Sequence, residues 1–549
     1  MPITTLRFVI ALSFLAVVQA AAQQPAFTHA DTLRGSITPE RAWWDVGFYD
    51  LHVRLDPSDS TIRGWNGITY RVTSKPRAMQ IDLQEPLRID SVLQDGRKVG
   101  FRRDGNAYFL AVSGQRTGTT RTVTVYYSGK PRVAQRPPWD GGLIWAHDPD
   151  GHEWISTACQ GLGASVWWPT KDTQTEEPDS QRVAVTVPDS MQVVGNGRLR
   201  GIERLPDGWS TYEWFVTSPI NNYDIAVSAG RYAPFTDSYE GENGHLTLDF
   251  WPLARNLDTA RVQWSQVKPM LACFEHWFGP YPWYRDGYQL VEAPHLGMEH
   301  QSAVAYGNGY ANGYKGKDLS GTGWGLTWDF IVIHESAHEW WGNSLTTADI
   351  ADMWVHESFA NYSESLYTEC RYGTNAGAEY VRGTRKLVKN DKPIVGPYGV
   401  NTEGSRDMYY KGGNMLHTIR QVIGNDTTWR AVLRGLNAKF QHRIVTGKEV
   451  QDYISSASGI DLSHVFAQYL TTTKIPAFEY RLTGDSLAYR WADVVPGFDM
   501  PVRVMTSPDS STRLSPTEAW QTTTLPISHS SDFHVDENYF VVVRLVTSQ

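Results

Sequence analysis

Two histidines flank a glutamate in the pattern His334-Glu335-Ser336-Ala337-His338. Residues four apart in a helix lie on one face, so both imidazoles can bind a single metal ion. Glu335 is turned by about 100° from His334 around the helix axis, which brings its carboxylate to the rim of that face. There it can take a proton from a water that the metal activates, so the pattern indicates a hydrolytic zinc centre with Glu335 as general base.

Glu357 is the candidate third ligand. It follows His338 by 19 positions, in a second stretch of helical periodicity around residues 354–360. Two histidines, one glutamate and a water are a known ligand set of hydrolytic zinc sites. Glu364, two turns further along the same predicted helix, is expected to accept the N–H of a ligand imidazole. The sequence therefore predicts one zinc ion per chain, although the first five-residue pattern alone would also fit an ordinary amphipathic helix.

Two further motifs accompany this spacing. Residues 296–300 read Leu-Gly-Met-Glu-His, and residues 409–412 read Tyr-Tyr-Lys-Gly. Together with two histidines and a glutamate separated by 18 residues, they resemble the gluzincin aminopeptidases, the zinc family that contains aminopeptidase N and leukotriene-A hydrolase. The resemblance runs over most of the chain and implies the same zinc ligands and the same general base.

The resemblance also implies a donor for the oxyanion that forms during peptide hydrolysis. Tyr409 matches the tyrosine of the family's Tyr-x-Lys-Gly motif and would donate a hydrogen bond to that oxygen. Tyr410 is the alternative donor, because the two tyrosines are adjacent.

A third implied role is recognition of a free amino terminus. Glu299 matches the glutamate of the family's Gly-x-Met-Glu-Asn motif and would bind the α-ammonium of the substrate. Gly297, Met298 and Gln160 would line the same amine site and the first side-chain pocket. An internal peptide bond would leave the Glu299 carboxylate buried and unpaired, so these residues predict peptide substrates with a free N-terminus.

The chain departs from the family pattern beside these residues. His300 replaces the motif's asparagine and Leu296 replaces its leading glycine, while His356 and Ser358 flank Glu357 where the family has asparagine and glycine. These changes leave the zinc ligands and the base untouched and bear on how the peptide is anchored.

The elements that must position these residues predict a multidomain α+β fold. Residues 23–235 show the period-two alternation of a β-rich domain, and residues 236–474 change to helical spacing, as in a thermolysin-like catalytic domain. In this second part, helices are expected over 257–278, 326–341, 353–372 and 415–423, with a strand at 288–292. Alternation returns in residues 475–549, which suffice for a small β-sandwich; no large C-terminal helical domain is expected.

The first residues have the character of a secretory signal peptide. A short start with one positive charge precedes an apolar run over residues 8–18, and small residues follow it. The run is shorter than the roughly 20 residues that span a bilayer. We therefore predict a signal peptide over residues 1–22 and an exported mature chain, periplasmic or secreted, without a transmembrane segment; a stable N-terminal anchor is the alternative.

The amino-acid composition limits the class of protein and the kinds of partner that the chain could have. The 549 residues are 41% hydrophobic and 20% charged, which is typical of a globular chain of several domains. The net charge of −9, without a basic block, argues against a nucleic-acid partner. Cys159, Cys273 and Cys370 lack a metal-binding spacing; they allow one disulfide at most or three free thiols. The oligomeric state is not indicated.

The predicted function is a zinc-dependent aminopeptidase that hydrolyses the first peptide bond with metal-activated water. A thermolysin-like endopeptidase is disfavoured by Glu299 and by the 18-residue spacing. A hydrolase of non-peptide substrates, such as an epoxide, has no positive sign in the sequence. A non-catalytic peptide-binding relative is disfavoured because all three ligands and the base are present.

Overall fold

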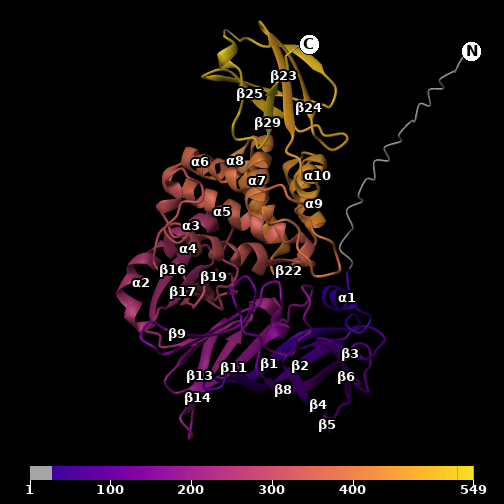
Figure 1. Cartoon of the computed structure of the whole chain (residues 1–549), viewed down its shortest axis with the longest axis vertical. Coiled ribbons are helices and arrows are strands. Elements are labelled where there is room, and N and C mark those ends of the chain that lie inside the picture. Colours follow the sequence, from indigo (N-terminus) through magenta and orange to yellow (C-terminus); the bar gives the residue numbers. More distant parts are fainter. Residues whose placement is uncertain (1–26, 528, 548–549) are drawn as a thin grey trace, which may run out of the picture.

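The computed structural model describes residues 27–527 and 529–547, and the predicted signal peptide lies outside the described residues. Three regions follow one another along the long axis of the molecule: a β-rich part in indigo and magenta, a helical part, and a small yellow β part that ends the described chain (Figure 1). This arrangement confirms the predicted multidomain α+β fold class. The boundaries at residues 235 and 474 stay predictions.

The largest sheet lies in the N-terminal region and has eight strands in the order β13-β14-β11-β1-β2-β8-β4-β5. Its long strand β1 pairs antiparallel with β2 and parallel with β11. Alternate β1 residues such as Leu51 and Val53 are buried, as the period-two pattern predicts. The strands are β1 (Trp44–Asp56), β2 (Thr61–Val72), β4 (Arg88–Gln94), β5 (Arg97–Lys98), β8 (Thr120–Gly129), β11 (Ser180–Pro188), β13 (Arg198–Leu205) and β14 (Trp209–Val216).

Two smaller sheets complete the N-terminal region. One has four strands in the order β12 (Gln192–Gly195), β15 (Val227–Gly230), β10 (Glu153–Ala158) and β9 (Gly142–His147). The other consists of β3 (Met79–Asp82), β7 (Ala107–Leu110) and β6 (Phe101–Asp104). Helix α1 (His29–Gly35) precedes the strands, and Thr28 and Asp31 cap its first turn reciprocally.

A five-stranded sheet lies between the N-terminal region and the helices, in the order β16-β17-β18-β20-β19. Its strands are β16 (Phe235–Gly241), β17 (Gly244–Trp251), β18 (Tyr288–Glu292), β19 (Gly297–Met298) and β20 (Val304–Tyr306). Leu290 and Val304 belong to the hydrophobic core of the helical region, whereas their neighbours Val291 and Ala305 belong to the core of the N-terminal region. Each face of this sheet is therefore buried against a different core, as alternation of side chains along a strand requires.

The helices form most of the middle of the molecule (Figure 1). They are α2 (Leu257–Gln263), α3 (Val267–Phe278), α4 (Phe330–Ala337), α5 (Trp354–Tyr372), α6 (Thr374–Gly383), α7 (Tyr410–Ile423), α8 (Asp426–Phe440), α9 (Gly447–Ser458) and α10 (Ser463–Thr471). A short parallel pair, β21 (Leu345–Thr347) and β22 (Arg443–Val445), lies among them.

The expected helices differ from the observed ones at their ends. The single helix expected over 257–278 is divided by a 3₁₀ turn at Trp264–Gln266, and α7 begins five residues before the expected 415. The helix expected over 326–341 is shorter, because Asp329 caps α4 at its start and a π turn at Glu339–Asn343 replaces its last turn. Apolar periodicity continues through such turns, which is why it overestimates helix length.

The C-terminal strands form two sheets, β27-β24-β23-β29 and β26-β25-β28. Their bounds are β23 (Ala477–Thr483), β24 (Ser486–Ala492), β25 (Val502–Ser507), β26 (Ser510–Leu514), β27 (Gln521–Thr524), β28 (His534–Val535) and β29 (Val542–Leu545). Buried residues of both sheets, such as Phe478 and Val504, belong to the same core cluster as the helices.

One disulfide, Cys273–Cys370, joins the middle of α3 to the end of α5 across 97 positions of sequence, and Cys159 is a buried free thiol. Among the described residues, no helix combines the length and apolar character needed to cross a membrane.

Candidate metal centre and peptide site

Helix α4 presents both histidines of the predicted zinc motif. At the start of α4, the Asp329 carboxylate accepts hydrogen bonds from the backbone N–H groups of Ile331 and Val332 at 3.1 and 3.4 Å. The chain leaves the helix through Gly342 at φ 130°, where a Cβ atom would lie 3.4 Å from Nδ1 of His338. Glycine at this position lets the backbone turn closely beside that imidazole.

The three predicted ligands converge. Oε2 of Glu357 lies 3.7 Å from Nε2 of His334 and 3.5 Å from Nε2 of His338. Ligands at 2.0–2.1 Å from a tetrahedral zinc ion are separated by about 3.4 Å, so these spacings fit such an ion. Oε2 of Glu357 is buried and accepts no hydrogen bond from the described residues. The donor set and this orphaned oxygen both fit zinc.

Outer contacts orient both imidazoles. Nδ1 of His334 lies 2.8 Å from Oε1 of Glu364, the residue predicted for this contact. The second Glu364 oxygen accepts a hydrogen bond from the Tyr380 hydroxyl at 2.7 Å. Nδ1 of His338 lies 2.9 Å from the backbone oxygen of Trp341. With each Nδ1 placed against an acceptor, each Nε2 is left free to bind metal.

The electrostatics of the centre favour a cation. Burial raises the pKa of Glu357, but attraction from the two imidazoles outweighs burial and holds that pKa below its usual range. Burial lowers the pKa of His338, while the charges of Glu299 and Glu357 more than compensate and raise it to about 9. Both shifts come from attraction between the carboxylates and the two imidazoles, and the same carboxylates would also attract a divalent cation.

Glu335 and Glu299 adjoin this centre. One ligand atom each of Glu299, Glu335 and His338 lie within 4.8 Å of one another. The Glu335 carboxylate is packed against β19, since a Cβ atom on Gly297 would lie 2.8 Å from its Oε1. Burial raises the pKa of Glu335. The predicted base and the predicted amine-binding residue thus lie side by side next to a ligand imidazole.

Glu299 is held by residues from distant parts of the chain. Its Oε1 accepts hydrogen bonds from the Gln160 amide and, at 3.3 Å, from the Tyr223 hydroxyl. Asn343 donates to its backbone oxygen at 2.7 Å. Burial raises the pKa of Glu299 to about 7. Gln160, predicted for the amine site, thus contacts Glu299, and its role there stays a prediction; Tyr223 and Asn343 were missed because no local motif marks them.

Of the two adjacent tyrosines, Tyr409 faces the metal ligands. Its hydroxyl donates to Oε1 of Glu357 at 2.8 Å, and its ring stacks near His334 at 6.0 Å between centroids. For Tyr410 the described residues provide no comparable hydroxyl contact with a ligand. Met298, the other residue predicted for the peptide site, is buried in the core of the N-terminal region.

A buried cluster of two histidines and a glutamate, with further carboxylates and a tyrosine against it, characterises a zinc metallopeptidase. Residues 265–469 match the Peptidase family M1 domain, the domain of the gluzincin aminopeptidases. The resemblance predicted from the sequence motifs is thereby confirmed.

Relatives and solved structures agree with this family. The chain is 22% identical over 417 residues to "Probable aminopeptidase 1" of Saccharolobus solfataricus, covering 73% of this chain and 51% of the relative. It is 23% identical over 481 residues to aminopeptidase N of Lactobacillus helveticus, covering 78% of this chain and 51% of the relative. The chain thus spans about half the length of these curated relatives.

Among solved structures, the M1 zinc metallopeptidase from Deinococcus radiodurans superposes with a TM-score of 0.68 at 20% identity, covering 79% of this chain and 95% of that one. A mutant of the Deinococcus radiodurans enzyme bound to a Tyr-Ser-Ala substrate gives a TM-score of 0.66 at the same identity, covering 79% and 96%. At this identity the likeness establishes the fold.

Proposed function

We propose that the chain is a zinc-dependent aminopeptidase that removes the N-terminal residue of peptides. The observation that carries this proposal is the position of Glu299, a buried carboxylate within 4.8 Å of the Glu335 carboxylate and of a His338 nitrogen. A carboxylate enclosed so close to the centre needs a cationic partner, and the α-ammonium of a peptide supplies one. The curated relatives named as aminopeptidases support the same activity.

In the proposed hydrolysis the metal ligands, the general base and the oxyanion donor have separate roles. His334, His338 and Glu357 would hold one zinc ion, which supplies Lewis acidity toward water and toward the scissile carbonyl oxygen. Glu335 takes the proton of the attacking water and delivers it to the leaving amine. The Tyr409 hydroxyl turns from Glu357 to the carbonyl oxygen as negative charge develops on it.

Glu299 sets the register of the substrate. Its carboxylate pairs with the α-ammonium, so the first peptide bond is the one placed against Glu335 and the metal ligands. Gln160 and Tyr223 both donate to Oε1 of Glu299 and hold its carboxylate in position. Fixing the reacting groups in this way converts binding energy at the amino terminus into rate.

The decisive experiment compares one peptide with its N-acetylated twin, each with and without a zinc chelator. We expect cleavage of the free peptide alone, its loss with chelator, and one zinc per chain by elemental analysis. Cleavage of both peptides would make the protein an endopeptidase. Cleavage of neither by the zinc-loaded protein would contradict an aminopeptidase and favour a non-catalytic relative or a non-peptide substrate.

A further inference from the structure

A small cavity adjoins the amine site. It lies between the N-terminal region and the residues that precede α5, and two of its lining residues, Gln160 and Tyr223, are the side chains that donate to Glu299. Its volume is about 10 Å³, which is the space of a single water. Because the α-ammonium and the first side chain of a peptide share one carbon atom, a peptide anchored on Glu299 would direct that side chain into this space.

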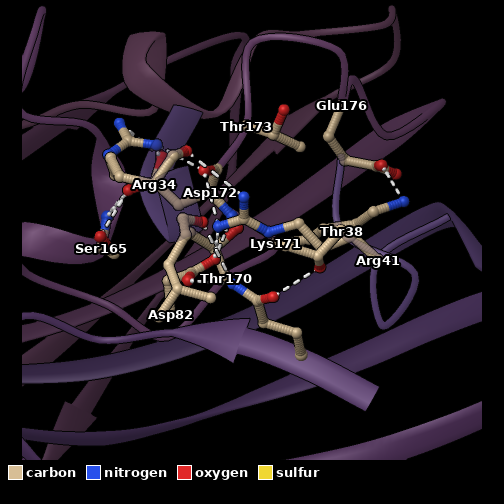
Figure 2. A network of polar contacts seen from close by, with 12 residues as sticks. Arg34, Thr38, Arg41, Asp82, Ser165, Thr170, Lys171, Asp172, Thr173 and Glu176 are labelled. Carbon is tan, nitrogen blue, oxygen red and sulfur yellow. Dashed lines mark hydrogen bonds and ion pairs between the residues drawn. The ribbon is translucent and has the colours of Figure 1, made fainter. Parts of the chain in front are cut away.

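Arg34 of helix α1 closes one side of the cavity, and Met353 lines it as well. The Arg34 guanidinium donates to the backbone oxygens of Asp172 and Leu162 and lies 3.3 Å from a carboxylate oxygen of Asp172 (Figure 2). A Cβ atom on Gly163, at φ 86°, would lie 2.0 Å from Arg34 Nη2. The guanidinium is therefore seated directly on the backbone at Gly163, and its position is determined by four contacts.

Helix α1 is itself held between two parts of the molecule. A Cβ atom on Gly35 would lie 2.2 Å from the backbone nitrogen of Asn401, in the segment that precedes α7. Asn401 in turn donates to the backbone oxygen of Gly161 at 3.0 Å and also lines the cavity. The wall that carries Arg34 is thus anchored on both sides and cannot retreat from a bound side chain without losing these contacts.

Most polar groups around the cavity are already engaged, although Nε of Arg34 is buried without a hydrogen-bond partner among the described residues. The Asp172 carboxylate accepts from the backbone and hydroxyl of Ser165 in addition to its ion pair with Arg34. Asn221 donates to the backbone of Gln174 at 3.3 Å and accepts from the backbone of Tyr223 at 3.1 Å. A cationic side chain entering here would lose its water and find the Asp172 carboxylate already paired with Arg34, which is costly.

We propose that Arg34 is a specificity-determining residue that restricts the enzyme to peptides whose first side chain is small and carries no positive charge, as in glycine, alanine and serine. The inference rests on the proposed aminopeptidase function. It adds that the limit is imposed by α1, an element outside the matched peptidase domain, rather than by the metal centre.

The test uses three peptides that differ only in their first residue, alanine, leucine or arginine, and measures kcat/KM for each with the full-length zinc-loaded protein. We expect alanine to be preferred over leucine by at least about 10-fold, the lower end for methylenes that a pocket does not accommodate. The Arg34→Ala variant should reduce that preference by about 10-fold, mainly through faster cleavage of the leucine peptide. The control variant Arg97→Ala, at an exposed residue of β5, should leave the preference for alanine over leucine unchanged.

The outcomes separate the two proposals. If leucine is cleaved as fast as alanine, the size limit is wrong although the aminopeptidase function stands. If Arg34→Ala slows cleavage of all three peptides in parallel, Arg34 has only a structural role and the specificity inference is wrong. The melting temperatures of Arg34→Ala and of Arg34→Lys, which keeps the charge, show whether the substitution has impaired folding. If no free-amine peptide is cleaved, the proposed function fails and the specificity inference falls with it.

Discussion

The carboxylates of the site differ in what they contact, although all are buried. Glu364 touches an imidazole and a tyrosine hydroxyl, Glu357 faces both imidazoles, and Glu335 lies against Gly297 of β19. Glutamine has the same shape as glutamate without its charge. Substituting glutamine one position at a time therefore separates metal binding from proton transfer.

We expect Glu364→Gln to weaken zinc binding by about 10- to 100-fold, because the His334 imidazole loses its charged acceptor. Glu335→Gln should retain zinc and lower kcat on a free-amine peptide by about 100-fold or more, because it cannot accept the proton of water. Competition with a chromophoric chelator measures the first effect and steady-state kinetics the second. Loss of zinc from Glu335→Gln would contradict its assignment as the base.

At this scale the sequence predicted residues that a motif marks and missed residues that no motif marks. His334 and His338 share one helix face, as do Glu357 and Glu364, so helical periodicity predicted each pair. Tyr223 reaches Glu299 from 76 positions away, and Asn343 lies on a π turn that apolar spacing does not reveal. Tertiary contacts of this kind carry no pattern within a short window.

At the scale of elements, the short strand β19 limits the space around the Glu335 carboxylate. A Cβ atom at Gly297 would lie 2.8 Å from both Oε1 of Glu335 and Cγ2 of Ile331. Such distances are shorter than van der Waals contact, so a methyl group there must displace the carboxylate or the helix.

We expect Gly297→Ala to lower kcat by about 10-fold or more, since a displacement of order 1 Å at a reacting group can cost about 100-fold. Zinc content should not change, because the ligands lie on α4 and α5. Gly201→Ala is the matched control, as that strand glycine has no neighbour within 4 Å of its Cβ position. Equal activity of the two variants would show that β19 does not position Glu335.

The ends of helices were the least predictable elements. The start of α4 depends on the Asp329 cap and its end on Gly342, and these determine where His338 points. Alternation predicted strands in the N-terminal region, but the order of the eight-stranded sheet, with β1 beside β11, depends on long-range pairing. Local patterns give the kind of element and leave its partners open.

For the molecule as a whole, the Cys273–Cys370 bridge closes a loop that contains α4 and most of α5, and with them all three zinc ligands. Sequence alone left the pairing of the three cysteines open, because it depends on how α3 packs against α5. A bridge of this kind is typical of oxidising compartments and supports the predicted export, which stays a prediction.

We expect reduction of the bridge, or the Cys273→Ser/Cys370→Ser double variant, to lower the free energy of unfolding by about 4.7 kcal/mol, as the chain-entropy model gives for a loop of roughly 100 residues. The midpoint of thermal unfolding, recorded with and without reductant, measures the effect. The Cys159→Ser variant is the control that tests whether loss of a buried thiol alone lowers the midpoint of unfolding. If the double variant and the natural chain have the same midpoint of thermal unfolding, the bridge contributes nothing to stability.

The five-stranded sheet has a practical consequence for anyone who shortens this protein. Because Leu290 and Val291 bury their side chains in opposite cores, a fragment trimmed to the peptidase segment would expose a row of apolar side chains to water. Exposed sheet surfaces of this kind drive precipitation. The smallest fragment that stays in solution therefore retains the N-terminal strands, even if no atom of theirs touches the scissile bond.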